Sequence, residues 1–281
     1  MKKNFKWFSR YALVTGAASG MGRIYCQQLA LKGYNVILVD INAAGLQETA
    51  KIVQETVEAS NKVPAEHKEV FRQIQIVQDL STMDAADRIF ETTEAAGCEV
   101  EVLVNNAGVM YCQGIAETSE RMLKLIMMVH MNTPLMLCRK YVNGMKERKR
   151  GYILNISSLA AWMSWPGIGM YGATKRFVKD YSRELRIECQ CTGVSVTNAY
   201  FGAVDTPLIP IKPSLKKLAR CIAVMITPER AVRRALRATF WRCRGTMPGL
   251  LNKIFLPFII ILPDFLLGWV YRKAKKHLMK V

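Results

Sequence analysis

Short apolar runs rich in β-branched residues alternate along the chain with longer segments in which apolar residues recur at helical spacing. Continuous runs such as "VILV" and "EVLV" are typical of strands that are buried on both faces of a sheet. Alternating strands and helices predict right-handed βαβ units and an α/β fold, a doubly wound parallel (Rossmann) sheet with helices on both faces. The expected strands are 11–17, 34–40, 70–79, 100–108, 151–158 and 193–200, and the expected helices are near 20–32, 43–59, 83–96, 119–149 and 170–190.

This alternation continues to about residue 245 and then gives way to a different pattern. We therefore expect one doubly wound domain over residues 1–245 and an apolar, basic helical tail over residues 246–281. The polar stretch 60–69, which contains Pro64, is expected to be a solvated loop. A chain of 281 residues is long enough to bury a substantial core.

The formal net charge of +18 is concentrated towards one end of the chain. Residues 205–281 contain 16 Lys and Arg against 3 Asp and Glu, a net charge of +13, whereas the first 204 residues carry +5. A positive end suits anionic lipid headgroups or nucleic acid. No recognised nucleic-acid module accompanies the basic residues of 229–244, so a solvated or lipid-facing helix is favoured and no nucleic-acid partner is expected.

Cysteine and histidine usage points away from metal sites and disulfide frameworks. The eight cysteines form no C-x-x-C pair, and His67, His130 and His277 lie far apart in the sequence. We expect reduced thiols, no metal and a cytoplasmic location. The N-terminal "MKKNFKWFS" lacks the apolar run of a signal peptide, so no secretion signal is expected.

The first predicted strand leads into a glycine-rich turn and a helix. Gly16, Gly20 and Gly22 have the spacing T-G-x-x-x-G-x-G, which lets the backbone approach a pyrophosphate at the start of the helix. An ordinary βα turn is the alternative. Asp40 ends the second strand 18 residues beyond Gly22, where a carboxylate binds the adenosine ribose diol and repels a 2′-phosphate. NAD is therefore favoured, and nearby Arg23 keeps NADP possible.

Further motifs in a fixed order resemble those of the short-chain dehydrogenase/reductase family, with a hydroxysteroid dehydrogenase-like character, over roughly residues 10–245. They are "DL" after the third strand, "NNAG" at the end of the fourth, and "NISS" at the end of the fifth. Ser158 precedes Tyr171 by 13 residues, and Lys175 follows four residues later. Tyr271 and Lys275 share this last spacing without such neighbours, so we interpret that pair as a coincidence.

The resemblance implies an enzyme that interconverts an alcohol and a ketone. By this resemblance, Tyr171 is the general acid/base, Ser158 hydrogen-bonds the carbonyl, Lys175 also holds ribose hydroxyls, and Asn132 positions a water. Tyr171 and Lys175 share a helix face, so the ammonium, helped by an oxidised nicotinamide, should lower the pKa of the phenol. The implied cofactor-binding residues are Thr15, Gly16, Ser19, Gly20, Met21, Gly22, Asp40, Asp79, Leu80, Asn106, Ala107, Gly108, Tyr171, Lys175, Gly202 and Thr206.

Two local details sharpen these expectations. Pro134 lacks an N–H, so the carbonyl of His130 would lose its helical partner and a kink could open the backbone near Asn132 to water. Alternatively, Asn132 and Pro134 end one helix and start another. Ser157 adjoins Ser158, but on an extended strand its side chain should point to the opposite side.

The loop after the sixth strand departs from the family pattern. In "YFGAVDTPL", Phe201 stands where the family usually has proline before glycine, whereas Thr206 matches the residue that contacts the carboxamide. The expected walls of the substrate pocket are Met110, Tyr111, Tyr200, Phe201 and the segments 159–170 and 207–226. They are apolar, which indicates a bulky steroid-like or long-chain lipid substrate. The alternative is that these side chains belong to the core or to a dimer contact.

The tail contains an 18-residue apolar stretch, 254–271, followed by "RKAKKH". As a helix it would measure about 27 Å, short of the ~30 Å hydrocarbon core, and Pro257, Pro263 and Asp264 interrupt it. We rank three alternative roles for this tail. A membrane-interface anchor is favoured, a flap over the mouth of the substrate pocket comes second, and a true membrane span comes last. The enzyme would thus be peripheral at a membrane and form homo-oligomers. A non-catalytic, nucleotide-binding scaffold of the same fold is the alternative function.

Overall fold

The computed structural model describes residues 7–111, 113–162, 167–205, 225–249 and 260–278. Its centre is a seven-stranded sheet of order β3-β2-β1-β4-β5-β6-β9, in which every pair of neighbours is parallel. The strands are β1 (Tyr11–Thr15), β2 (Asn35–Asp40), β3 (Gln73–Val77), β4 (Val100–Asn105), β5 (Gly151–Ser158), β6 (Val194–Phe201) and β9 (Gly245–Thr246). The predicted doubly wound fold and its six strands are confirmed. The seventh strand, β9, escaped prediction because two residues carry no periodicity.

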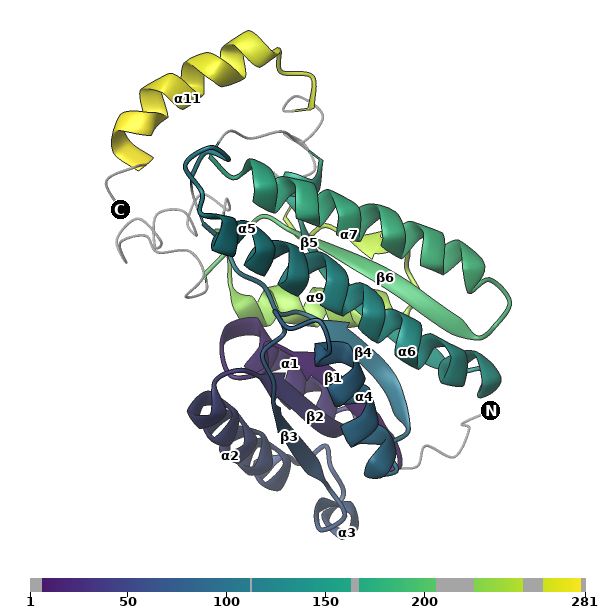
Figure 1. Ribbon diagram of the computed structural model, residues 1–281. Helices are drawn as coiled ribbons and strands as arrows, with labels where there is room; N and C mark the ends of the chain where they lie inside the picture. The colour runs from purple at the N-terminus through teal and green to yellow at the C-terminus, as the bar shows by residue number, and fades with distance from the viewer. Residues whose placement is uncertain (1–6, 112, 163–166, 206–224, 250–259, 279–281) are drawn as a thin grey trace.

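Helices cover both faces of the sheet (Figure 1). Each face has its own apolar core. On one face lie α1 (Gly20–Ala30), α2 (Ala43–Ala59) and α9 (Pro228–Phe240). On the other lie α4 (Ala85–Ala95), α6 (Thr133–Glu147) and α7 (Gly169–Glu188). Strand alternation divides the side chains between the two cores, so that Leu13 packs on the second face while its neighbours Ala12 and Val14 pack on the first.

The helix starts follow from local capping chemistry. The side chain of Asn42 accepts a hydrogen bond from the Gly45 N–H at the start of α2, and Thr227 caps α9 in the same way. Ser119 accepts a hydrogen bond from the Met122 N–H at the start of α5 (Glu120–Met127). Such caps satisfy N–H groups that the first turn of a helix leaves unpaired.

The helix that carries Asn132 changes its winding in the middle. Between α5 and α6 lies η1 (Met128–Asn132), a π-helical turn, and Pro134 falls in the first turn of α6. The backbone N–H of Thr133 reaches back five residues to the carbonyl of Met128. The regular α-helix therefore ends at Met127 and resumes at Thr133, and the segment between them is a π turn, a form often found at functional sites. Whether this turn opens the backbone near Asn132 to water stays a prediction.

Smaller elements complete the described chain. A four-residue helix, α3 (Ala65–Lys68), lies inside the stretch expected to be a loop, and η2 (Leu159–Ala161) follows β5. The strands β7 (Ala203–Val204) and β8 (Met225–Ile226) form a separate two-stranded sheet. In the tail, α11 (Asp264–Leu278) begins directly after Pro263 and lies at the periphery of the molecule (Figure 1). Within the described ranges, no helix is both long and apolar enough to cross a membrane.

Candidate active site

The carboxyl ends of β1 and β4 bring the glycine-rich loop against the "NNAG" segment. The Thr15 Oγ1 accepts hydrogen bonds from the N–H groups of Asn106 and Ala107, each at 3.1 Å. The Asn106 side-chain amide donates in return to the Thr15 carbonyl at 2.9 Å. Thr15 is 2% exposed, so its hydroxyl serves to join the two loops, and direct contact with a cofactor stays a prediction for this residue.

Two glycines of the loop are required by close backbone approach. A Cβ at Gly22 would lie 1.8 Å from the carbonyl oxygen of Gly16. Gly16 has φ +68°, and a Cβ there would lie 2.9 Å from the Cα of Ala107. The loop therefore packs tightly under the start of α1, where Ser19 makes no side-chain capping bond. The N–H groups of the first helical turn thus remain available to an anionic ligand such as a pyrophosphate.

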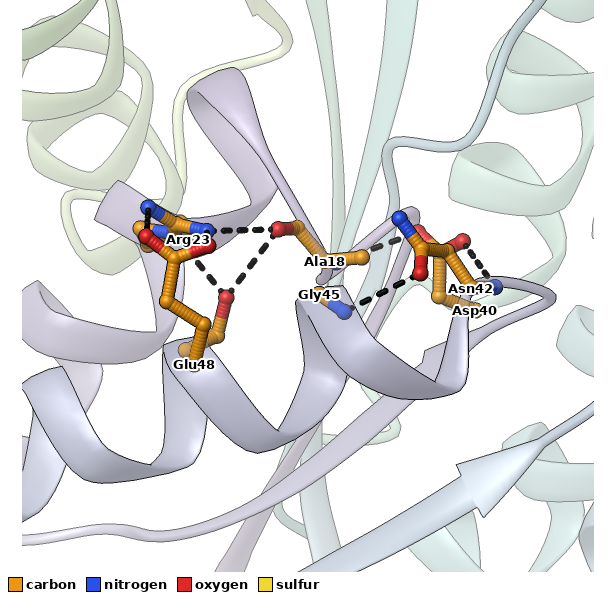
Figure 2. Close-up of polar contacts among 7 residues, drawn as sticks. Ala18, Arg23, Asp40, Asn42, Gly45 and Glu48 are labelled. Atoms are coloured by element: carbon orange, nitrogen blue, oxygen red, sulfur yellow. Dashed lines mark hydrogen bonds and ion pairs between the residues drawn. The ribbon is translucent and has the colours of Figure 1, made fainter.

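The end of β2 carries the predicted ribose-binding carboxylate. The Asp40 Oδ2 accepts a hydrogen bond from the Ala18 N–H at 3.1 Å, and its Oδ1 accepts one from the Asn42 N–H at 3.0 Å (Figure 2). Asp40 is therefore oriented by the glycine-rich loop on one side and by its own turn on the other. Further along the rim, the Asp79 Oδ1 accepts hydrogen bonds from the backbone and side chain of Ser81.

Three of the four predicted catalytic residues line one pocket of about 280 Å³. Ser158 ends β5, and Tyr171 and Lys175 lie one turn apart on α7. The Lys175 Nζ lies 5.7 Å from the centroid of the Tyr171 ring and donates a hydrogen bond to the Ile156 carbonyl at 3.0 Å. The pocket is also lined by Met21, Asn106, Gly108, Met110, His130, Ile156, Ser157, Ile168, Phe201, Gly202, Ala203 and Val204.

The two adjacent serines have different partners. The Ser157 hydroxyl donates to the Lys175 carbonyl at 2.9 Å and is 2% exposed. The Ser158 hydroxyl accepts from the Ala160 N–H at 3.1 Å and lies beside the Tyr171 phenol. Ser157 therefore holds α7 against β5, while Ser158 is the serine that neighbours the Tyr171 phenol.

The expected lowering of the Tyr171 pKa is wrong for the protein's own groups. Burial raises the pKa of the phenol, and the neighbouring Ser158 hydroxyl lowers it only in part. Burial also lowers the pKa of Lys175 to about 8, because the ammonium is only 5% exposed. The sequence indicated the spacing of the two residues but not how deeply both would be buried.

Sequence reasoning missed His130, which links three parts of the site. Its Nε2 accepts a hydrogen bond from the Val109 N–H at 2.9 Å, so the neutral ring carries its proton on Nδ1. Nδ1 donates to the Thr174 Oγ1 at 3.0 Å, and Thr174 donates to the Tyr171 carbonyl at 2.8 Å. The His130 ring also meets the Tyr171 ring edge to face, with 5.6 Å between centroids. Burial, and then the charge of Lys175, lower the pKa of His130 well below its usual value.

The remaining predicted residues fall into three groups. Asn132 ends the π-helical turn two residues after His130 and does not itself line the pocket. Leu80 accepts a hydrogen bond from the Thr133 hydroxyl at 2.8 Å through its carbonyl, so it positions the start of α6. Thr206, and the substrate walls predicted over 163–166 and 207–224, lie outside the described residues.

The predicted substrate walls are divided between two pockets. Met110 and Phe201 line the pocket that holds Tyr171. Tyr200 instead lines a second pocket of about 500 Å³ with Trp162, Lys179, Arg183 and Arg244. Neighbouring side chains of β6 point to opposite faces, which separates Tyr200 from Phe201.

Comparison with known proteins agrees with this geometry. A family model described as short chain dehydrogenase matches residues 10–213. The very-long-chain 3-oxoacyl-CoA reductase of Anas platyrhynchos is 33% identical over 272 residues, which cover 93% of this chain and 74% of that protein. The very-long-chain 3-oxoacyl-CoA reductase-A of Danio rerio is 29% identical over 228 residues, 79% of this chain. This chain covers 65% of that relative's length.

Solved structures share the fold at lower identity. A 7beta-hydroxysteroid dehydrogenase superposes with a TM-score of 0.76 at 24% identity, covering 89% of this chain and 91% of that one. A short-chain dehydrogenase from Sphingobium yanoikuyae in complex with NADPH has a TM-score of 0.72 at 20% identity, with 90% and 96% covered. A 3-ketoacyl-(acyl-carrier-protein) reductase from Brucella melitensis complexed with NADH has a TM-score of 0.69 at 23% identity, with 83% and 91% covered.

Proposed function

Because this chain belongs to the short-chain dehydrogenase family, we propose that it interconverts a secondary alcohol and a ketone on a steroid-like or long-chain lipid substrate with a nicotinamide cofactor. The single observation that carries the proposal is the convergence of Ser158, Tyr171 and Lys175 on one pocket beside the glycine-rich loop. Curated relatives named 17-beta-hydroxysteroid dehydrogenase type 3 and very-long-chain 3-oxoacyl-CoA reductase support the substrate class.

The side chains of the pocket divide the chemistry between them. A bound nicotinamide would supply or accept the hydride. Tyr171 gives a proton to the oxygen of the substrate in reduction and takes it back in oxidation. Its raised pKa keeps the phenol protonated at neutral pH, which suits the role of proton donor. The Ser158 hydroxyl hydrogen-bonds the same oxygen and holds it beside the phenol.

Lys175 and the residues around it hold the arrangement together. Its ammonium has one backbone partner, the Ile156 carbonyl, and keeps further N–H donors for the hydroxyls of a ribose. The lining residues Met21, Met110, Ile168 and Phe201 give the pocket an apolar wall. A wall of this kind favours a bulky hydrophobic substrate and excludes water from the reacting atoms.

NAD is the proposed cofactor. The Asp40 carboxylate faces the glycine-rich loop at the end of β2 and would accept hydrogen bonds from a ribose diol. A 2′-phosphate at the same place would meet a like charge. A preference for NADPH above about tenfold in kcat/KM would overturn this assignment.

The proposed activity is tested with a panel of steroids and long-chain alcohols and ketones. Each substrate is incubated with NAD(H) and with NADP(H), and turnover is followed by the absorbance of the reduced nicotinamide. We expect turnover of at least one bulky apolar member with NAD(H). Tight cofactor binding without turnover of any member would instead favour a non-catalytic scaffold.

We further propose that α11 brings the enzyme to a membrane surface. The start of α11 and the residues just before it expose a group of large apolar side chains: Ile261, Leu262, Phe265, Leu266 and Trp269. The opposite side of the helix turns towards the body of the protein, where a Cβ at Gly114 would lie 3.3 Å from the Tyr271 hydroxyl. Basic residues follow in the sequence from Arg272. An apolar face beside lysines and arginines suits the headgroup region of a bilayer.

Flotation with anionic liposomes tests this membrane proposal. We expect the wild type to float with the vesicles at low salt and Phe265→Ser/Trp269→Ser to lose most of that binding. Trp241→Ser is the matched control, because Trp241 is a 65% exposed tryptophan at the end of α9. Equal binding of the double variant and the wild type, or a wild type that stays soluble without vesicles or detergent at low salt and never floats, would refute the proposal.

A further inference from the structure

Arg23 lies in α1, directly after the last glycine of the glycine-rich motif, and most of its N–H donors already have partners within the protein. The Arg23 Nη1 and Nη2 donate to the two carboxylate oxygens of Glu48 at 3.0 and 2.7 Å. Nη2 also donates to the Ala18 carbonyl at 2.9 Å (Figure 2). Nε donates to the Thr49 Oγ1 at 3.0 Å. Four of the five N–H groups of the guanidinium therefore have partners.

Ala18 connects this arginine to the ribose-binding carboxylate. Its N–H donates to Asp40, and its carbonyl accepts from Arg23 (Figure 2). One residue of the loop thus fixes the guanidinium on one side and the carboxylate on the other. A free guanidinium near the ribose is what an NADP-binding site would use for the 2′-phosphate.

We propose that Glu48 is a determinant of nucleotide specificity. From α2 it binds the guanidinium of Arg23 and so keeps that guanidinium from binding a 2′-phosphate. The inference rests on the proposed function and adds to it a residue beyond Asp40. With Glu48 in place, two carboxylates and one guanidinium border the site. Without Glu48, the charge of Arg23 would balance that of Asp40, and the guanidinium would regain two donors.

Because the ion pair between Glu48 and Arg23 is partly exposed, a role in stability can be distinguished from a role in nucleotide specificity. The Glu48 side chain is 61% exposed and the Arg23 side chain 23%. Exposed ion pairs contribute little to stability, so replacing Glu48 should leave the fold intact. The hydrogen bonds and charge of Arg23 lower the pKa of Glu48, so the carboxylate is ionised at neutral pH. If the pair only joined α1 to α2, its loss would leave nucleotide discrimination unchanged.

The test measures binding of two nucleotides that differ only in the 2′-phosphate. Adenosine 5′-monophosphate and adenosine 2′,5′-bisphosphate are titrated into the full-length protein by calorimetry, which needs no turnover. We expect the wild type to prefer the monophosphate. In Glu48→Gln the ratio of the two Kd values should move about tenfold towards the bisphosphate.

Matched variants isolate the guanidinium from a general change in charge. Glu55→Gln removes the same charge from α2 two turns away, at an exposed position, and should leave the ratio of Kd values unchanged. Arg23→Gln combined with Glu48→Gln should abolish the shift of the Kd ratio towards the bisphosphate, because no guanidinium remains to be released. Thermal unfolding of all variants verifies that they are folded, and Glu48→Ala provides a second test of the same release.

The outcomes also separate this inference from the proposed function. If the wild type binds the monophosphate but Glu48→Gln and Glu48→Ala keep its ratio of Kd values, the role of Glu48 is refuted and the nucleotide site stands. An equal gain in Glu55→Gln would refute it as well. If the folded wild type binds neither nucleotide, the proposed function fails and the role of Glu48 fails with it.

Discussion

The amino and carboxyl ends of the strands both bury charged groups, but they satisfy them in opposite ways. At the amino ends, Glu101 is 1% exposed and accepts from three donors. These are Arg10 at 2.5 Å, Tyr34 at 2.7 Å and Arg150 at 2.8 Å. Each donor directly precedes a strand, so the cluster joins the starts of β1, β2, β4 and β5.

At the carboxyl ends, the buried charge is left without a counter-charge. Lys175 is 5% exposed and has a backbone carbonyl as its partner. Within the described parts of the chain, no carboxylate forms an ion pair with it. An uncompensated buried ammonium is costly, and the lowered pKa of Lys175 expresses that cost. The comparison indicates that the charged groups at the amino ends of the strands stabilise the fold, whereas Lys175 at the carboxyl ends keeps N–H donors that a ligand can use.

Replacing Tyr171 by phenylalanine should have the largest effect on activity. Without the phenolic hydroxyl the substrate oxygen has no proton donor, so we expect kcat to fall about 10²–10⁴-fold. Cofactor binding by calorimetry and the free energy of unfolding in urea should change little. Turnover close to that of the wild type, with the cofactor still bound, would remove Tyr171 from the mechanism.

Replacing Glu101 by alanine should act on stability and spare the chemistry. The change leaves Arg10, whose side chain is 11% exposed, without its buried partner. Breaking a buried pair of this kind costs about 3–5 kcal/mol in the free energy of unfolding, measured by urea denaturation. Glu99→Ala is the matched control, because Glu99 lies at the same edge with a side chain 46% exposed and 3.7 Å from Arg148. Equal destabilisation by the two variants would contradict the contrast between the ends of the sheet.

The sequence was sufficient for those parts of the molecule that depend on local pattern. Periodicity predicted the six longer strands and the helices between them because each buries its apolar residues at a regular spacing. The spacing of Ser158, Tyr171 and Lys175 was enough to expect them in one site. The spacing of Gly16, Gly20 and Gly22 is also local, so the glycine-rich turn could be expected from the sequence, although the contact of Gly16 with Ala107 could not.

Features built from distant residues were not predictable in the same way. Glu101 and its partner Arg10 are separated by 91 positions, and no pattern pairs them. A lone histidine such as His130 is indistinguishable by sequence from an ordinary core residue. The direction of the Tyr171 pKa depends on burial, which follows from tertiary packing and not from its helical neighbour Lys175.

Replacing His130 should have an intermediate effect, and on both stability and activity. His130→Ala removes the acceptor of the Val109 N–H, and a buried unpaired donor costs about 1–3 kcal/mol. We also expect kcat to fall, because the variant no longer links the loop at Val109 to the helix of Tyr171. His130→Gln, whose amide can both accept and donate, should recover part of that kcat.

The pH dependence of stability distinguishes His130 from a residue that only fills space. The pKa of His130 is lowered on folding, so at acidic pH this side chain is protonated in the unfolded chain but stays neutral in the folded protein. The free energy of unfolding should therefore decrease as pH falls below about 6.5, the usual value for histidine. His130→Gln should show a smaller decrease in urea unfolding. An identical decrease in both proteins would mean that His130 is not the group responsible.

The smallest effect concerns the charge of Lys175. Its pKa of about 8 means that the ammonium is present below that pH and is lost above it. We expect kcat/KM to decrease above about pH 8 and to be about tenfold lower one pH unit beyond it.

The free energy of unfolding should depend on pH in a different way. The unfolded chain keeps its proton up to the usual lysine pKa of about 10.4, so between the two values the unfolded state binds more protons and this group favours folding as pH rises. Circular dichroism at the same pH values should therefore record a folded enzyme that has lost activity, because the charge that disappears belongs to the ligand-binding end of the sheet and not to the Glu101 cluster. Parallel loss of fold and activity would contradict this assignment.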